Sequence, residues 1–334
     1  MQHLLPLRKQ YFKASLHTHS TVSDGKLTPE EVKALYKEAG YQIVALTDHH
    51  IVARHPELND EGFLALTGIE LGLDAEDYVP PASFFGKTYH INLIAKDPDN
   101  LWQPYPPKAI LDKNRVHAEA AHWDDRLRTY SLENANEILC RAGEEGFLAI
   151  YNHPTWSMQS YPDYAGLKGL WALEIRNTHN VLKGYDDNNQ RVYQDLLQLG
   201  NRLNVVMADD SHRPVAVGGC WTMIGAEELT YASVIEAMER GDVYASCGPE
   251  IHSLTWEGGK LRVTCSPAAR VTVQTQARHA QCEMGEGLTE VEFDLSVWLE
   301  KSAGNPNAFF RLTVTAADGT YAETRAYWLD ELKG

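Results

Sequence analysis

The sequence predicts an α/β barrel followed by a smaller β domain. From Phe12 to about Val243, short apolar runs alternate with helical segments, which is typical of parallel strands joined by crossover helices. After Gly248-Pro249 the composition shifts to runs of β-forming residues separated by turn dipeptides. At 334 residues the chain is long enough for two unequal domains. We therefore expect a barrel over residues 1–247 and an antiparallel β domain over residues 248–334.

The first helix is marked at both ends. Thr28 is a helix cap, Pro29 takes the first helical position, and Glu31 stands three residues after the cap. Gly40 then closes the helix. The apolar run Ile43 to Thr47 predicts a buried strand directly after it.

Further apolar runs predict the remaining barrel strands, at Phe63 to Ile69, His90 to Ala95, Phe147 to Tyr151, Leu170 to Ile175 and Asn204 to Ala208. Polar clusters follow the C-terminal ends of most of these runs. In a parallel α/β barrel the loops after the strands form the functional face, so these clusters should converge there. His90 instead begins its run, which indicates either an antiparallel strand or a different strand boundary.

Two other regions are set apart by their composition. Asp97 to Tyr130 is a long insertion with Trp102, Tyr105 and a helical piece that holds His117 and His122. A connection of this length is usually functional, so we expect a lid or a pocket wall, the alternative being a surface excursion. The C-terminal runs carry no cluster of ligating residues, and we expect a packing or substrate-edge role for them.

The charge balance excludes some classes of function. The formal net charge of −16 argues against a protein that binds long nucleic acids, because such binding depends on clustered Lys and Arg. A phosphorylated small molecule stays possible as the substrate. No apolar run has the length that a signal peptide or a membrane helix needs. The five cysteines form no CxxC pair and are interpreted as reduced thiols, so we expect a cytoplasmic protein without membrane partners.

The candidate metal ligands are histidines and carboxylates that lie at or near predicted strand ends. His17 and His19, two residues apart, project from one face of an extended strand and can reach one metal ion. The full set is His17, His19, Asp24, His49, Glu70, His90, His153, Asp210 and His212. Nine ligands are too many for one ion but suit two or three divalent ions about 3.5–4 Å apart. Nitrogen and oxygen donors without cysteine fit zinc, manganese or iron.

These motifs occur in the order of a known family. The chain has His17-Thr18-His19 with Ser23-Asp24-Gly25, Thr47-Asp48-His49, Gly68-Ile69-Glu70, His90, Asn152-His153-Pro154 and Asp210-Ser211-His212. Over Phe12 to Cys247 it resembles the polymerase and histidinol phosphatase (PHP) family of metal-dependent phosphoesterases. The resemblance implies a distorted seven-stranded (βα) barrel, similar to a TIM barrel, and a trinuclear site formed by the nine residues above, with Glu70 bridging. The appended β domain resembles that of bacterial two-domain relatives, some of them similar to carbamate or ester hydrolases.

The resulting hypothesis is hydrolysis of a phosphate ester of a small molecule or nucleotide by a metal-bridging hydroxide. Its catalytic residues would be Asp24, Glu70 and Asp210. The phosphate would be bound by Arg176, His179 and Arg213, since an arginine fork suits two phosphate oxygens. Two neighbouring carboxylates, Asp48 and Asp209, are candidates for orienting ligands. The alternatives are hydrolysis of a carboxylic ester, carbamate or amide at the same site, and a non-catalytic metal-loaded scaffold. The oligomeric state is not predicted.

Overall fold

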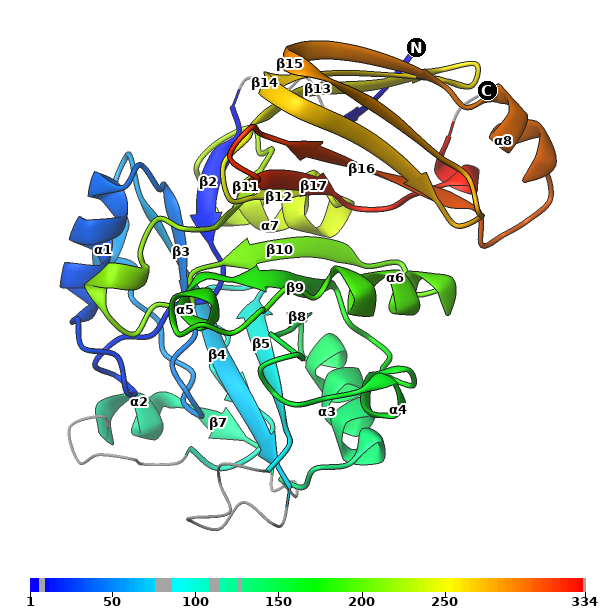
Figure 1. Cartoon of the computed structure of the whole chain (residues 1–334). Helices are drawn as coiled ribbons and strands as arrows, with labels where there is room; N and C mark the ends of the chain where they lie inside the picture. The colour runs from blue at the N-terminus through cyan, green and yellow to red at the C-terminus, as the bar shows by residue number, and fades with distance from the viewer. Residues whose placement is uncertain (6–9, 76–85, 108–114, 125–127, 333–334) are drawn as a thin grey trace.

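A computed structural model describes residues 1–5, 10–75, 86–107, 115–124 and 128–332. The α/β part built from the first two thirds of the chain lies below a strand-rich C-terminal part (Figure 1). Within the described residues, one sheet of sixteen strands runs through both parts. The two parts therefore share a continuous backbone hydrogen-bond network.

Seven strands follow one another around the α/β part. In order of pairing they are β2 (Phe12–Ser15), β3 (Ile43–Leu46), β4 (Leu64–Asp74), β5 (Thr88–Ala95), β8 (Phe147–Tyr151), β9 (Ala172–Asn177) and β10 (Asn204–Ala208). The pairs among β2, β3 and β4 are parallel, and so are those among β8, β9 and β10. A parallel bridge between Thr18 and Ser211 joins the continuations of β2 and β10. The seven segments thus form a ring.

Strand β5 breaks the regular pattern. It is antiparallel to both of its neighbours, β4 and β8. No helix is described between β4 and β5, so the structure confirms the predicted α/β class but not a regular (βα)7 barrel. An antiparallel β5 explains the position of His90. The first residues of β5 lie beside the C-terminal ends of the parallel strands, where the other polar clusters are.

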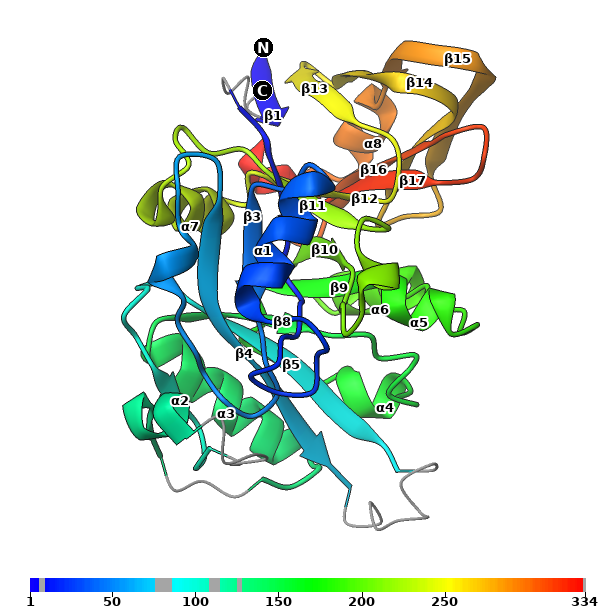
Figure 2. The same ribbon diagram turned by 90° about the vertical axis from the view of Figure 1, so that its left-hand side faces the viewer.

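Helices cover the outside of the ring (Figure 2). Helix α1 (Pro29–Glu38) has the predicted capping box between Thr28 and Glu31. The other longer helices bury one apolar side each, and they are α3 (Leu132–Glu144), α6 (Gln190–Gln198) and α7 (Tyr231–Arg240). Short helices are α2 (Arg115–Ala120), α4 (Tyr161–Tyr164) and α5 (Thr178–Leu182), with 3-10 turns at Pro56–Leu58, Pro214–Ala216 and Leu329–Glu331. Among the described helices, none combines the length and the apolar character that a membrane crossing requires.

The insertion packs onto the ring. It contains β6 (Trp102–Gln103) and β7 (His122–Trp123), which pair with each other, and α2 between them. Trp102 and Tyr105 are buried in the same apolar cluster as residues of β4 and β5. The predicted helical piece is confirmed for His117, whereas His122 lies in β7. Residues 108–114 and 125–127 of the insertion lie outside the described part of the chain.

The C-terminal part is rich in antiparallel strands, as expected. These are β13 (Ile251–Glu257), β14 (Lys260–Thr275), β15 (Ala280–Asp294), β16 (Phe309–Thr315), β17 (Tyr321–Thr324) and β18 (Tyr327–Trp328). One helix, α8 (Ser296–Lys301), lies among them, so this part is not purely β. Strands β11 (Trp221–Ile224) and β12 (Val243–Ser246) connect it to β2. Strand β1 (Gln2–Leu5) pairs with β13. A domain boundary at residue 247 stays a prediction.

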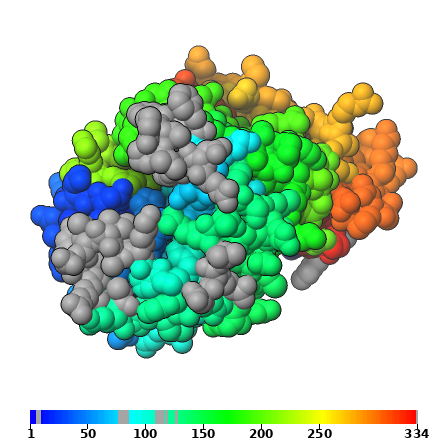
Figure 3. Space-filling view, turned by 90° about the horizontal axis from the view of Figure 1, so that it is seen from below, coloured from blue at the N-terminus to red at the C-terminus, as the bar shows by residue number. Residues whose placement is uncertain are grey.

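In the space-filling view from below (Figure 3), the C-terminal part, in orange, lies at one side of the visible surface. The segments coloured blue to green make up most of the rest of that view. The candidate site is built from these earlier segments.

Candidate metal centre

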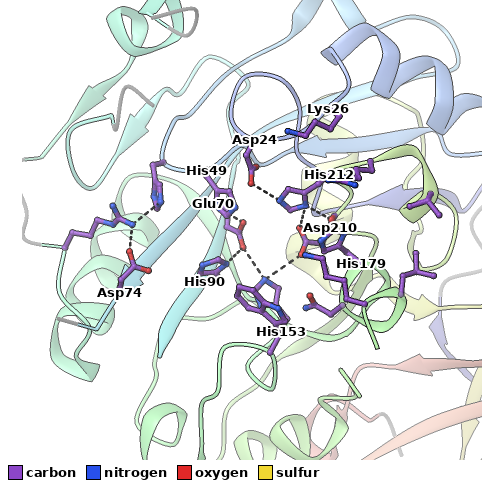
Figure 4. A pocket seen from close by; sticks show the side chains of 18 residues that line it. Asp24, Lys26, His49, Glu70, Asp74, His90, His153, His179, Asp210 and His212 are labelled. Carbon is purple, nitrogen blue, oxygen red and sulfur yellow. Dashed lines mark hydrogen bonds and ion pairs between the residues drawn. The ribbon is translucent and has the colours of Figure 1, made fainter. Parts of the chain in front are cut away.

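A cavity of about 810 Å³ opens where the parallel strands of the ring end. Seven of the nine predicted ligands line it, and Figure 4 labels all seven: Asp24, His49, Glu70, His90, His153, Asp210 and His212. The other two, His17 and His19, are buried beside them, each 1% exposed. The structure therefore brings all nine predicted residues together.

Backbone pairing places the first and last ligand motifs side by side. The amide of His19 donates to the carbonyl of Ser211, and the amide of Asp210 donates to the carbonyl of His17. These bonds continue the ring past the ends of β2 and β10. As a result, residues almost 200 positions apart in sequence share one small volume.

Glu70 stands at the centre of the histidines. Its Oε1 lies 3.2 Å from His17 Nε2 and 3.0 Å from His90 Nδ1. Its Oε2 lies 3.2 Å from His19 Nε2 and 3.1 Å from His49 Nδ1. His153 Nε2 also lies 3.4 Å from Oε1, so the two oxygens of one carboxylate face two different groups of imidazoles. This is the arrangement that a bridging ligand needs.

Two further carboxylates flank Glu70. Asp210 Oδ1 lies 3.1 Å from His19 Nε2 and 3.3 Å from His17 Nε2. Asp24 Oδ2 lies 3.3 Å from His212 Nε2. Dashed lines in Figure 4 join Asp24 to His212, and His153 to both Glu70 and Asp210.

The donor set fits divalent metal ions. Four overlapping groups of these residues each place their ligand atoms within 4.8 Å of one another: His19, Asp24, His49 and His212; His17, His19 and Glu70; His17, His153 and Asp210; and Glu70, His90 and His153. Three buried atoms of the cluster, His19 Nδ1, His49 Nδ1 and Asp210 Oδ1, have no hydrogen-bond partner among the described residues. Buried polar atoms are costly without a partner, and a bound cation would supply one.

The electrostatics of the cluster are those of a tightly coupled network. Burial acts to lower the pKa of His19, but the nearby carboxylates of Asp210 and Glu70 raise it to about 10. Burial acts to raise the pKa of Glu70, yet the surrounding histidines hold it well below its usual value. Burial lowers the pKa of His49 to about 3. Metal binding at His19 would therefore displace a proton, whereas His49 is already neutral.

The backbone is strained at the same place. His153 has a φ of 26° and Asp210 a φ of 49°, both in the left-handed region that residues with a Cβ rarely adopt. His50, which follows His49, has a φ of 59°. Such strain persists where the surrounding structure fixes the residue, and it is concentrated at functional sites.

A second layer of polar residues orients the ligands. Glu174 Oε1 lies 3.1 Å from His17 Nδ1, and its Oε2 accepts a hydrogen bond from the amide of His153. Asn152 Nδ2 donates to Glu70 Oε1 at 3.0 Å, and Asn177 Nδ2 donates to Asp210 Oδ2 at 3.0 Å. Sequence reasoning missed Glu174. Its signal was an acidic residue inside an otherwise apolar predicted strand.

The two carboxylates next to ligands hold loops rather than imidazoles. Asp48 accepts hydrogen bonds from the amides and hydroxyls of Ser20 and Ser23, and so fixes the loop that carries Asp24. Asp209 accepts from the amides of Gly218, Gly219 and Cys220. It therefore fixes the far end of the loop that begins with His212.

Of the three residues predicted to bind phosphate, His179 and Arg213 line the cavity and Arg176 does not. The pairing of β9 with β10 shifts register, so that Glu174 lies opposite Val206 but Arg176 lies opposite Met207. Val206 packs in the apolar cluster inside the ring. Met207 packs in the apolar cluster that lies between the ring and the outer helices α3 and α6. The irregularity thus turns Arg176 away from the site, and its guanidinium lies 6.0 Å from the ring of Tyr321.

Other cavity-lining cations were not predicted from the sequence. Lys26, Lys183 and Arg128 line the cavity together with Arg213. Arg128 comes from the insertion and pairs with Asp74 at 2.8 Å. The structure shows no ion pair of Lys26, Lys183 or Arg213 with a described residue. The insertion therefore contributes to the cavity wall. The three cations without an ion pair to a described residue line the same cavity as the candidate metal ligands.

Residues 15–151 match the family model of the PHP domain. No curated protein matches the sequence. Among solved structures, a two-domain protein from Bacteroides vulgatus, containing a predicted PHP-like metal-dependent phosphoesterase, is 16% identical with a TM-score of 0.46, and 98% of each chain is covered. A putative metal-dependent phosphoesterase from Bifidobacterium adolescentis is 15% identical with a TM-score of 0.38, covering 60% of this chain and 88% of that one. An amidohydrolase from Chromobacterium violaceum is 18% identical with a TM-score of 0.37, covering 60% and 87%.

The matched segment ends just before Asn152-His153-Pro154, so three of the nine clustered residues lie beyond it. His153, Asp210 and His212 are linked to the other six by the geometry described above. The chain thus joins a segment that matches the PHP domain family to a strand-rich C-terminal part.

Proposed function

We propose that this protein is a metal-dependent phosphoesterase acting on a small phosphorylated molecule or nucleotide. The observation that carries the proposal is the position of three cations, Lys26, Lys183 and Arg213, which form no ion pair with a described residue and line a cavity where nine nitrogen and oxygen ligands converge. The chain as a whole has a net charge of −16. Cations gathered at this one opening therefore favour an anionic substrate.

The protein's own residues have distinct parts in this proposal. Asp24, Glu70 and Asp210, with the six histidines, would hold two or three ions of zinc, manganese or iron. When bound, such ions lower the pKa of a water molecule and neutralise charge on the phosphoryl oxygens. Arg213, Lys26 and Lys183 would bind the remaining phosphate oxygens. Burial lowers the pKa of His179 to about 4, so this residue faces the substrate as a neutral imidazole.

The charge of the protein supports a small substrate rather than long nucleic acid. The cytoplasmic location and the absence of membrane partners remain predictions from the sequence.

The test is a panel of chromogenic substrates. Chelator-treated protein should be inactive, and manganese, zinc or iron should restore hydrolysis of p-nitrophenyl phosphate or bis(p-nitrophenyl) phosphate. Lys26→Ala and Lys183→Ala should each raise KM several-fold. Lys168→Ala is the matched control, because Lys168 is exposed and does not line the cavity.

Three outcomes would overturn the proposal. Full turnover by metal-free protein would exclude the metal mechanism. Restored activity on p-nitrophenyl acetate with none on either phosphate would instead favour carboxylic ester, carbamate or amide hydrolysis. Metal binding without activity on any substrate of the panel would favour the non-catalytic scaffold.

A further inference from the structure

Two cysteines lie opposite each other on neighbouring strands, outside the cavity. Strands β11 and β12 are antiparallel with Trp221 opposite Ser246. One step further along the same register, Cys220 lies opposite Cys247, and Cys247 packs against the apolar cluster that contains Cys220. Directly opposite residues of an antiparallel pair have Cα atoms about 4.5–5.5 Å apart, within the range that a disulfide spans. Both thiols are free.

A cation faces this pair. The Arg176 side chain is half-buried and turned away from the metal centre, and it interacts electrostatically with Cys220 and Cys247. Arg176 forms no ion pair with any carboxylate in the described part of the chain. Nearby, the buried hydroxyl of Tyr321 has no hydrogen-bond partner among the described residues. A half-buried arginine without a carboxylate is a partner that a thiolate would suit.

The surroundings divide the two thiols into a reactive one and a protected one. Cys247 is half-buried, and the neighbouring Cys220 lowers its pKa to about 6 although burial acts to raise it, with further help from the Tyr321 amide and the Arg176 charge. Asp318 opposes this shift. Burial raises the pKa of Cys220, which is 1% exposed, and Asp209 adds to the increase. This pattern of one thiolate beside one buried thiol is typical of redox-active pairs.

We propose that Cys220 and Cys247 form a reversible thiol/disulfide site that is oxidised by hydroperoxides. The Cys247 thiolate attacks the peroxide oxygen, which gives a sulfenic acid and releases water once the leaving hydroxide is protonated. The Cys220 sulfur then attacks the sulfenic sulfur, and a second water leaves as the disulfide forms. Two thiols and one hydrogen peroxide thus give one disulfide and two waters. A dithiol reductant returns the pair to thiols by exchange.

The site is connected to the loop at the cavity. The Cys220 amide is one of the three that Asp209 binds at the end of the loop that begins with His212 and Arg213. Neither cysteine lines the cavity. The proposal is therefore independent of the reaction that the metal centre performs, and its test does not use activity.

The first experiment identifies the disulfide. The reduced full-length protein is treated with a small excess of hydrogen peroxide, digested without reduction and examined by mass spectrometry. The expected product is a peptide pair joined through Cys220 and Cys247, which dithiothreitol removes. Cys247→Ser should abolish it, whereas Cys220→Ser should leave a trappable sulfenic acid on Cys247. Over-oxidation of the exposed Cys140 and Cys282 with no Cys220–Cys247 link would overturn the proposal.

The second experiment tests the thiolate. At pH 6.5, iodoacetamide should label Cys247 roughly fivefold faster than Cys140 or Cys282, because a larger thiolate fraction outweighs the lower nucleophilicity of an acidic thiol. Arg176→Gln should remove most of this advantage, and Arg176→Lys should keep part of it. Equal labelling of the three cysteines in the folded wild-type protein would contradict an activated Cys247. Circular dichroism of each variant checks that it is folded.

Discussion

Buried charges occur in both halves of this molecule, but they are satisfied in different ways. In the C-terminal part, Arg311 and Glu323 form a buried ion pair, and side-chain amides of Gln274 and Gln190 complete their hydrogen bonds. In the metal centre, Glu70, His17 and His19 are equally buried, yet His19, His49 and Asp210 keep atoms without hydrogen-bond partners among the described residues. The first arrangement is complete within the protein. The second leaves buried atoms to which a bound cation would supply a partner.

The largest effect is expected from Glu70→Gln. Glu70 belongs to two of the ligand groups, and loss of one contact that merely orients a ligand already costs 10–100-fold in metal affinity. We expect activity to fall by at least roughly 10⁴-fold, which is more than 5 kcal/mol. Metal content by mass spectrometry and turnover of the restored enzyme measure this. A variant that retains full metal content and activity would remove Glu70 from the centre.

Glu323→Gln provides the counterpart in the C-terminal part. Removing one charge of a buried pair costs about 3–5 kcal/mol, because the other charge stays buried without a partner. We expect this loss in the free energy of unfolding, measured by chemical denaturation, with no change in metal content of the folded protein. A loss of metal as well would show that the two regions are coupled.

The metal-free protein should show a pH dependence that comes from Asp187. This carboxyl is 1% exposed, and burial raises its pKa to about 6 from an ordinary 3.8. The folded state therefore binds this proton more tightly than the unfolded state does, and stability is lost as the pH rises from about 4 to 6. The free energy of unfolding is measured at pH 3.5 and at pH 7 for the wild type and for Asp187→Asn. Between these two pH values, the wild type should lose about 3 kcal/mol more than the variant does. Parallel curves for the two proteins would contradict this.

The smallest effect is expected from Glu174→Gln. The variant keeps a side chain that can hydrogen-bond to His17 but lacks the charge that makes the imidazole a better ligand. Metal affinity should fall 10–100-fold, while saturating metal restores most of the activity. Titration with zinc against a competing chelator measures the affinity. If excess metal does not restore activity, Glu174 has a further part in the reaction.

The ligand set was predictable because its members recur at strand ends, where a parallel sheet brings distant residues together. His17, His153 and His212 are examples. The direction of β5 could not be predicted, because the hydrophobic pattern of a strand is the same whether the strand pairs in parallel or antiparallel. Arg176 was placed on the wrong side, since one irregularity in the pairing of β9 reverses the alternation of side chains. The lysines of the cavity rim were not predicted because their loops carry no periodic signal.

Strand β1 has a consequence for the order in which the chain assembles. It precedes the ring in the sequence, yet its partner β13 follows the entire ring. During synthesis β1 must therefore remain unpaired while the ring folds, and its docking is among the late steps that close the C-terminal sheet. A nascent chain stalled before β13 would expose this strand to other chains, so its few residues carry a risk of misassembly that the finished protein no longer has.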